Sequence, residues 1–209
     1  RRVLFRSDGD GSMHLGNRMG TLRGGEVAWT PLAPGQRFSW ERYPVATSDL
    51  VAHMVHEHQA GAVNRIARAQ YLARELKGTA TAAAEARMDA EARELARYLL
   101  FADEAPLPMP LDGGDRAFRE DFVRARRVVA GHSLRDLELR TRLLRHRCSY
   151  MIHTAQFDGL EASIRRRVLA WIGRAVADEA RPPGLDHLEE GERKVIREIL
   201  SRTVAGFAG

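Results

Sequence analysis

Three histidines within six residues, His53, His56 and His58, have the residue type and spacing that best suit ligand chemistry in this sequence. Residues three and four apart share one face of an α-helix. If the stretch is helical, His53, His56 and Glu57 therefore present two imidazoles and a carboxylate together. This set predicts a site for a divalent metal, provided that a further ligand comes from another helix.

His146 and His153 are the candidates for that further ligand, because they lie seven residues apart on a later predicted helix. The order HxxHE in the first stretch matches neither HExxH nor HxxEH, so the pattern does not indicate a metalloprotease. The ExxH spacing of di-iron bundles is also absent. The alternative interpretation is a solvated polar face that carries several histidines.

His58 differs from its neighbours because it falls inside an apolar stripe, between Val55 and Ala62. A histidine in that position is either a core residue that is hydrogen-bonded to a neighbour or a ligand of a planar cofactor. If a haem lies on this helix, His58 is the residue that we expect to bind it.

The elements that must position these side chains are predicted to be helices. Apolar residues at steps of three and four predict one long helix over residues 47–78, with Ser48 or Asp49 as its N-cap and Gly78 in the left-handed conformation that ends it. The same periodicity predicts later helices at 81–102, 115–129, 133–156, 161–178 and 189–204. The fold class is therefore mainly α, a bundle of five or six helices.

Residues 1–46 have a different composition, rich in glycine and without a helical period. Short strands are predicted at 3–6, 21–23 and 26–30, separated by turn signals. We therefore divide the chain into a loop-rich and β-containing segment, 1–46, that packs on the body, and an α-helical domain, 47–209.

The composition excludes several classes of protein. At 44% hydrophobic and 29% charged residues, the chain is typical of globular proteins. Its net charge of +5 comes almost wholly from arginine, and alanine and glycine are abundant too, as GC-rich codon usage produces. A nucleic-acid partner is therefore not expected. Cys148 is the only cysteine, so these residues hold no CxxCH site for covalent haem. No apolar run reaches the length of a transmembrane helix.

Several stretches of the chain resemble an uncharacterised family of exported bacterial proteins, some of which carry a c-type haem site before the matching region. The matching stretches are HLGN at 14–17, SDLVAHMVHEHQAGAVNRIARAQY at 48–71, ARYLLFADEAPLP at 96–108, SLRDLELRTRLLRHRCSYMIHTAQFDGL at 133–160 and HLEEGERKVIREIL at 187–200. The resemblance implies a periplasmic location and association with electron-transfer proteins. His14, in the first stretch, joins His58 as a candidate cofactor-binding residue.

Together with the composition and the predicted helices, the resemblance implies a periplasmic accessory or scaffold subunit that is not itself catalytic. Its expected partner is a c-type cytochrome or a membrane redox complex. The alternative is a redox protein that binds haem or a divalent metal, through His58 or through the pair His53 and His56.

Overall fold

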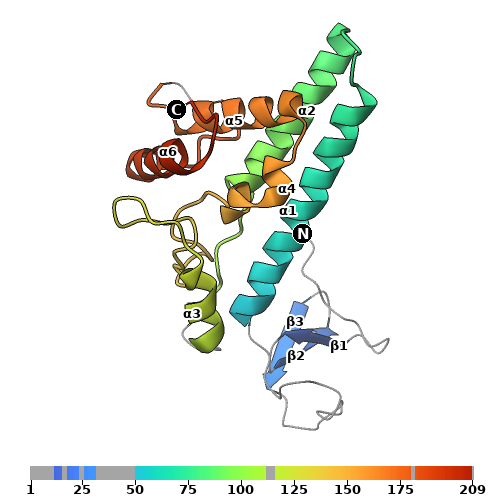
Figure 1. Ribbon diagram of the computed structural model, residues 1–209. Coiled ribbons are helices and arrows are strands. Elements are labelled where there is room, and N and C mark those ends of the chain that lie inside the picture. The colour runs from blue at the N-terminus through green and yellow to red at the C-terminus, as the bar shows by residue number, and fades with distance from the viewer. Residues whose placement is uncertain are drawn as a thin grey trace.

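The two longest helices, α1 (Leu50–Glu75) and α2 (Ala82–Leu99), form an antiparallel hairpin that contacts the α-helices α4 and α5 of the later chain (Figure 1). The computed structural model describes residues 12–15, 18–23, 26–31, 50–111, 116–179 and 182–208. In these ranges a 3-10 turn and four more α-helices follow: α3 (Arg116–Arg124), η2 (Tyr150–His153), α4 (Ala155–Asp158), α5 (Ala162–Val176) and α6 (Glu190–Thr203). The prediction of a mainly α fold with five or six helices is confirmed.

The hairpin forms as its sequence predicts. The side chains that α1 buries follow the predicted apolar stripe and include His58: Val51, Val55, His58, Ala62, Ile66, Ala69 and Ala73. Gly78 has a φ of 81° in the turn after α1, a conformation that glycine adopts without strain. Thr81 caps α2 by accepting a hydrogen bond from the Ala84 amide. The predicted N-caps of α1, Ser48 and Asp49, lie outside the described residues.

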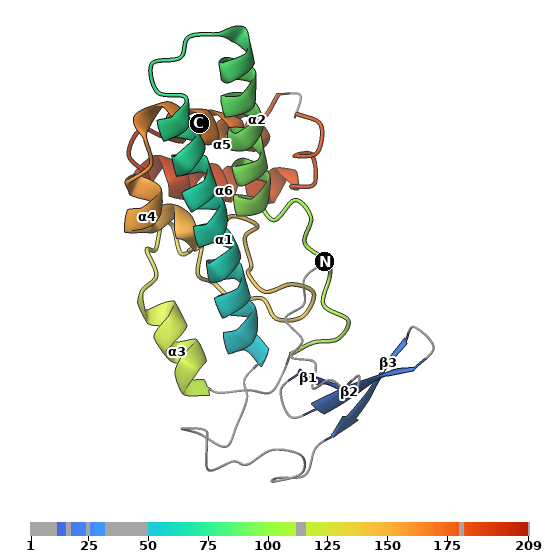
Figure 2. The same ribbon diagram turned by 90° about the vertical axis from the view of Figure 1, so that its right-hand side faces the viewer.

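The two helices approach closely at a glycine. The Tyr98 hydroxyl donates to the carbonyl of His58 at 3.0 Å, and a Cβ at Gly61 would lie only 2.1 Å from that hydroxyl. Gly61 therefore makes room for the tyrosine ring between α1 and α2. Helix α5 packs on α2, where the indole of Trp171 donates to Asp89 at 3.0 Å, and α6 packs on α5 (Figure 2).

The predicted helix over 133–156 is wrong. The chain there forms turns and a short hairpin before η2 and α4. The backbone amides of residues 140–142 all donate to one carboxylate oxygen of Glu138, at 2.7–3.1 Å. Leu139 has a φ of 62°, which a right-handed helix does not allow. Local bonds from a side chain thus replace the helical ladder.

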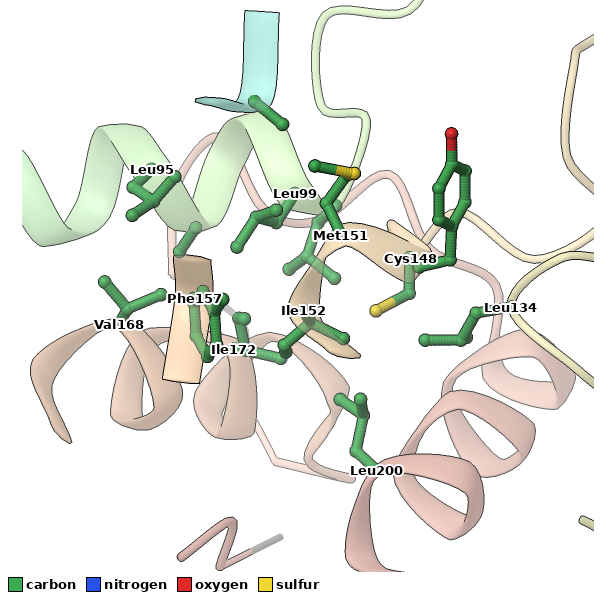
Figure 3. Packing of buried hydrophobic residues seen from close by; sticks show 14 of the residues in the cluster. Leu95, Leu99, Leu134, Cys148, Met151, Ile152, Phe157, Val168, Ile172 and Leu200 are labelled. Atoms are coloured by element: carbon green, nitrogen blue, oxygen red, sulfur yellow. The ribbon is translucent and has the colours of Figure 1, made fainter. Parts of the chain in front are cut away.

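This irregular segment is nevertheless part of the core. Its apolar side chains lie among those of α2 and α6, as Figure 3 shows for Leu134, Cys148, Met151, Ile152, Leu95, Leu99 and Leu200. Burial, and then the charge of Glu192, raises the pKa of the Cys148 thiol, which disfavours the reactive thiolate. Burial in the core therefore explains why this irregular segment carries so many apolar residues.

Three strands, β1 (Ser12–Leu15), β2 (Arg18–Arg23) and β3 (Glu26–Pro31), form an antiparallel sheet in the order β1-β2-β3. The predicted strands at 21–23 and 26–30 lie within β2 and β3, whereas the one predicted at 3–6 lies outside the described residues. No helix in the described ranges is long and apolar enough to cross a membrane.

Candidate metal centre

Two imidazoles and a carboxylate meet in the loops that join α3 to α4, drawn in yellow to orange in Figure 1. Each of His132, Asp136 and His146 offers one ligand atom, and these three atoms lie within 4.8 Å of one another. Nδ1 of His132 is 3.2 Å from Nε2 of His146. Across the ranges that the structure describes, this is the only group of three or more histidine, cysteine or acidic residues with such spacing.

The spacing of the two nitrogens suits a shared metal ion. With zinc–nitrogen bonds of about 2.0–2.1 Å and tetrahedral angles, two ligand nitrogens lie about 3.3 Å apart. A hydrogen bond between a protonated and an unprotonated nitrogen has a similar length. Two imidazoles and one carboxylate favour zinc and its neighbours over calcium or magnesium, which prefer oxygen ligands. Three protein ligands leave a fourth position for water or another ligand.

A tight turn places His132. Val129 and His132 donate to each other's carbonyl oxygens at 2.9 Å, so they close a two-residue turn. The central residues, Ala130 and Gly131, have φ values of 49° and 84°. Positive φ at both positions is the signature of a type I′ turn. The turn therefore fixes the backbone of His132 through paired hydrogen bonds.

A short hairpin brings Asp136 and His146 together. Leu137 and Leu144 pair across it, and the amide of Arg145 donates to the carbonyl of Asp136 at 2.7 Å. Asp136 and Arg145 thus face each other at the base of the hairpin, and His146 is the next residue. The two ligands lie ten positions apart in the sequence, and the hairpin brings them close together in space.

The carboxylate of Asp136 is held in place by neighbours on both sides. One oxygen accepts from the amide of Ser133 at 2.9 Å, and the other lies 3.6 Å from a guanidinium nitrogen of Arg126. The side chain of Asp136 is only 14% exposed. These contacts orient the carboxylate before any metal binds, as the outer partners of metal ligands commonly do.

The imidazole of His146 is buried. Burial, and then the neighbouring His132, lowers the pKa of His146, while Asp136 and Glu192 act in the opposite direction. The neutral imidazole is the form that can donate a lone pair to a metal. The loops therefore present His146 in the protonation state that metal binding needs.

The structure places His58 in an aromatic environment inside the body. Its Nε2 lies 2.6 Å from the buried hydroxyl of Ser149. Its ring stacks between Tyr98 and Phe101, with centroid distances of 5.3 Å and 4.6 Å. Burial, and then the charge of Arg65, lowers the pKa of His58 to about 4. These contacts agree with the alternative in which His58 is a hydrogen-bonded core residue. A cofactor bound at Nε2 would have to displace the Ser149 hydroxyl.

The other predicted site residues lie away from His132, Asp136 and His146, which we call the triad. His53 and His56 are exposed on α1 and Glu57 is half-buried, and their ligand atoms do not form a group of three within the described ranges. The metal site predicted there stays a prediction. The side chain of His14 lies outside the described residues. His153 bonds to the hydroxyl of Thr203 at 2.8 Å and does not join His146.

Sequence reasoning named His146 as a possible ligand but missed His132 and Asp136. On the predicted helix over 133–156, Asp136 and His146 would be about 15 Å apart along the axis, too far to share a metal. A signal was present in the HxxxD spacing of residues 132–136, directly after the glycine at 131. The wrong helix assignment concealed it.

Comparison of the chain with models of protein families, with curated proteins and with solved structures finds no match. The resemblance to exported bacterial proteins thus stays a prediction.

Proposed function

We propose that this chain is a metal-binding helical domain that holds one divalent transition metal, with zinc as the best fit, on His132, Asp136 and His146. The observation that carries the proposal is the convergence of three ligand atoms within 4.8 Å, with the two imidazole nitrogens 3.2 Å apart. The donor set and the buried, neutral His146 support the same assignment.

The metal would join two local structures of the irregular segment. His132 belongs to the turn at 129–132, whereas Asp136 and His146 belong to the base of the hairpin. Residues on both sides of this site contribute to the core, for example Leu134 and Cys148. A metal bound to all three ligands would therefore stabilise the irregular segment that covers α2 and α6.

Isothermal titration calorimetry of the chelator-treated protein with zinc chloride tests the proposal. We expect one site per chain. The substitution His132→Gln removes one ligand, and the affinity should fall by more than the roughly 10- to 100-fold that outer-shell changes cost. The double variant His53→Gln/His56→Gln is the control, because it removes two imidazoles from the exposed surface of α1.

Each outcome of the titration has a clear meaning. Zinc binding that survives in the control and is lost in the His132 variant supports the triad. Binding that is lost in the control but kept in the His132 variant would instead locate the metal on α1. Absence of stoichiometric binding to the unsubstituted protein would refute the proposal.

A second proposal is that the domain is a non-catalytic accessory subunit in the periplasm, docked on a c-type cytochrome or a membrane redox complex. The net charge of +5 suits an acidic partner surface, and Tyr71 on α1 is 71% exposed, a large aromatic residue available for contact. Retention of haem-staining proteins from periplasmic and membrane fractions, reduced by Tyr71→Ser, would support this role. A Soret band in the isolated protein would contradict it.

A further inference from the structure

A small cavity with a strongly cationic lining lies between the start of the irregular segment and η2. Its volume is about 110 Å³. By the usual size of a buried water site, it can hold several water molecules. The polar residues among those that line it are two arginines, one histidine and three residues with hydroxyl groups: Arg127, Arg135, His153, Ser133, Tyr150 and Thr154. Among the described residues that line it there is no carboxylate, so its charge is not neutralised from within.

The guanidinium of Arg135 is fixed in position by aromatic rings. It lies over the ring of Tyr150 at 4.6 Å and over that of Phe122 at 5.1 Å, both measured to the ring centroid. One of its nitrogens donates to the Phe122 carbonyl at 3.1 Å. A guanidinium has five N–H donors in a planar fork, so this bond leaves donors for a ligand. Arg135 is therefore preorganised to bind a ligand with several acceptor oxygens.

Arg127 contributes the second guanidinium, and one of its nitrogens donates to the Thr203 carbonyl at 3.3 Å. Neither Arg127 nor Arg135 forms an ion pair in the part of the chain that the structure describes. Two arginines that line one small cavity, without an ion pair in the described ranges, repel each other. An anion between them would remove that repulsion.

His153 lines the same cavity, and its protonation responds to the charge around it. The Thr203 hydroxyl donates to the Ile199 carbonyl at 2.7 Å, so it accepts from Nε2–H of His153 at 2.8 Å. This assigns the proton of the neutral ring to Nε2. Burial, and then Arg127, lowers the pKa of His153 to about 4; Asp158 opposes this shift and Arg135 adds to it. An anion in the cavity would favour the protonated ring.

We propose that this cavity binds a tetrahedral oxyanion, either free inorganic phosphate or the terminal group of a phosphomonoester. Guanidinium groups form paired, charge-assisted hydrogen bonds with phosphate oxygens, and the hydroxyl groups supply further donors. The cavity size suits a group with five heavy atoms. The proposal does not rest on the metal site, although the residues between His132 and Asp136 contribute to its lining.

The test is a titration of the full chain with inorganic phosphate at pH 6, in a chelating buffer with ionic strength held constant by sodium chloride. Calorimetry measures affinity, and NMR of the imidazole C–H groups reports the protonation of His153. We expect saturable binding and a shift of the His153 signal toward the imidazolium form. A parallel titration with phenyl phosphate distinguishes the two sources: binding of both ligands indicates a phosphomonoester site, and binding of phosphate alone indicates a free-anion site.

The substitution Arg127→Gln removes one guanidinium from the exposed side of the cavity and should weaken phosphate binding by about tenfold or more. The matched control is Arg124→Gln, which removes an exposed guanidinium from α3 that pairs with Asp121 at 2.7 Å, and it should change affinity less than about twofold. The His132→Gln variant should still bind phosphate. Equal effects of the two arginine substitutions, or no saturable binding by the unsubstituted protein, would overturn the proposal.

Discussion

Nε2 of His58 lies 2.6 Å from Oγ of Ser149, which follows it by 91 residues. The bond joins the N-terminal half of α1 to the residue that caps η2, since the same hydroxyl accepts from the Met151 amide at 3.1 Å. Ser149 is fully buried and His58 is 7% exposed. A substrate cannot reach this hydroxyl in the folded protein, so the pair stabilises the fold and is not a nucleophile with its base.

The first prediction concerns the stability of the protein in mild acid. The pKa of His58 is about 4 in the folded protein, against 6.5 as its ordinary value. Between these values the unfolded chain binds the proton and the folded chain does not, so stability is lost as pH falls from about 6.5 toward 4. At pH 5 the expected loss from His58 is about 2 kcal/mol relative to pH 7.5. Urea unfolding at the two pH values measures it.

The variant His58→Gln isolates this contribution, because glutamine has a polar group near the position of Nε2 but does not titrate. His153 also has a pKa of about 4 and adds to the acid sensitivity of both proteins. The difference between the two proteins therefore reports His58. If the free energy of unfolding of the variant falls with pH as much as that of the unsubstituted protein, the imidazole of His58 is accessible to protons in the folded state.

The second prediction concerns the close approach of α1 and α2. A Cβ at Gly61 would lie 2.1 Å from the hydroxyl oxygen and 2.9 Å from Cζ of Tyr98. Gly61→Ala should therefore destabilise the protein by roughly 1–3 kcal/mol, although alanine is the better helix former. In the background Tyr98→Phe the cost should be smaller, because the nearest atom is gone. Urea unfolding of the four proteins measures the coupling, and additive effects would contradict the contact.

The elements that sequence periodicity predicted well are those whose apolar spacing repeats over several turns. α1, α2, α5 and α6 each bury a stripe at steps of three and four, so their types were predictable and their ends lie within a few residues of the expected positions. Gly78 also takes the expected left-handed conformation in the turn after α1. These features depend on local geometry, which the sequence records directly.

The segment at 133–156 was mispredicted because its local signals are ambiguous. The Ser133 amide donates to the Asp136 carboxylate, a local bond that also occurs at the start of helices. Glu138 then binds three successive amides, and Leu139 takes a positive φ. Apolar residues that fill a core from a hairpin can have helical spacing by coincidence. The triad depends on that hairpin, so no periodicity could reveal it.

The third prediction is that zinc stabilises the fold through the triad. A ligand at a concentration 100 times its Kd stabilises the folded state by about 2.7 kcal/mol. For a chain of this size the melting temperature should rise by about 5–10 °C. Asp136→Asn should abolish most of this increase, since the amide oxygen can still accept from Ser133 but the ligand loses its charge. Differential scanning calorimetry with zinc and with EDTA measures the shift, and an equal rise in the variant would contradict the site.

The fourth prediction concerns the ion pair between Arg147 and Glu192, which ties the segment before η2 to α6. Two guanidinium nitrogens of Arg147 donate to one carboxylate oxygen at 2.6 Å and 3.0 Å, and its amide donates to the other at 2.6 Å. The side chains are only 18% and 9% exposed. Burial alone would raise the pKa of Glu192, but the bonds from Arg147 outweigh it and lower the pKa.

Arg147→Met removes the positive partner and leaves a buried carboxylate with one backbone donor, so the protein should lose roughly 3 kcal/mol of stability at pH 7. Adding Glu192→Leu should recover much of this loss, because the uncompensated charge is then gone. The matched control is the exposed pair of Arg116 and Glu120 on α3, where Arg116→Met should cost less than about 0.5 kcal/mol. Equal losses from the two arginine substitutions in urea unfolding would show that the Glu192 carboxylate is solvated in the folded protein.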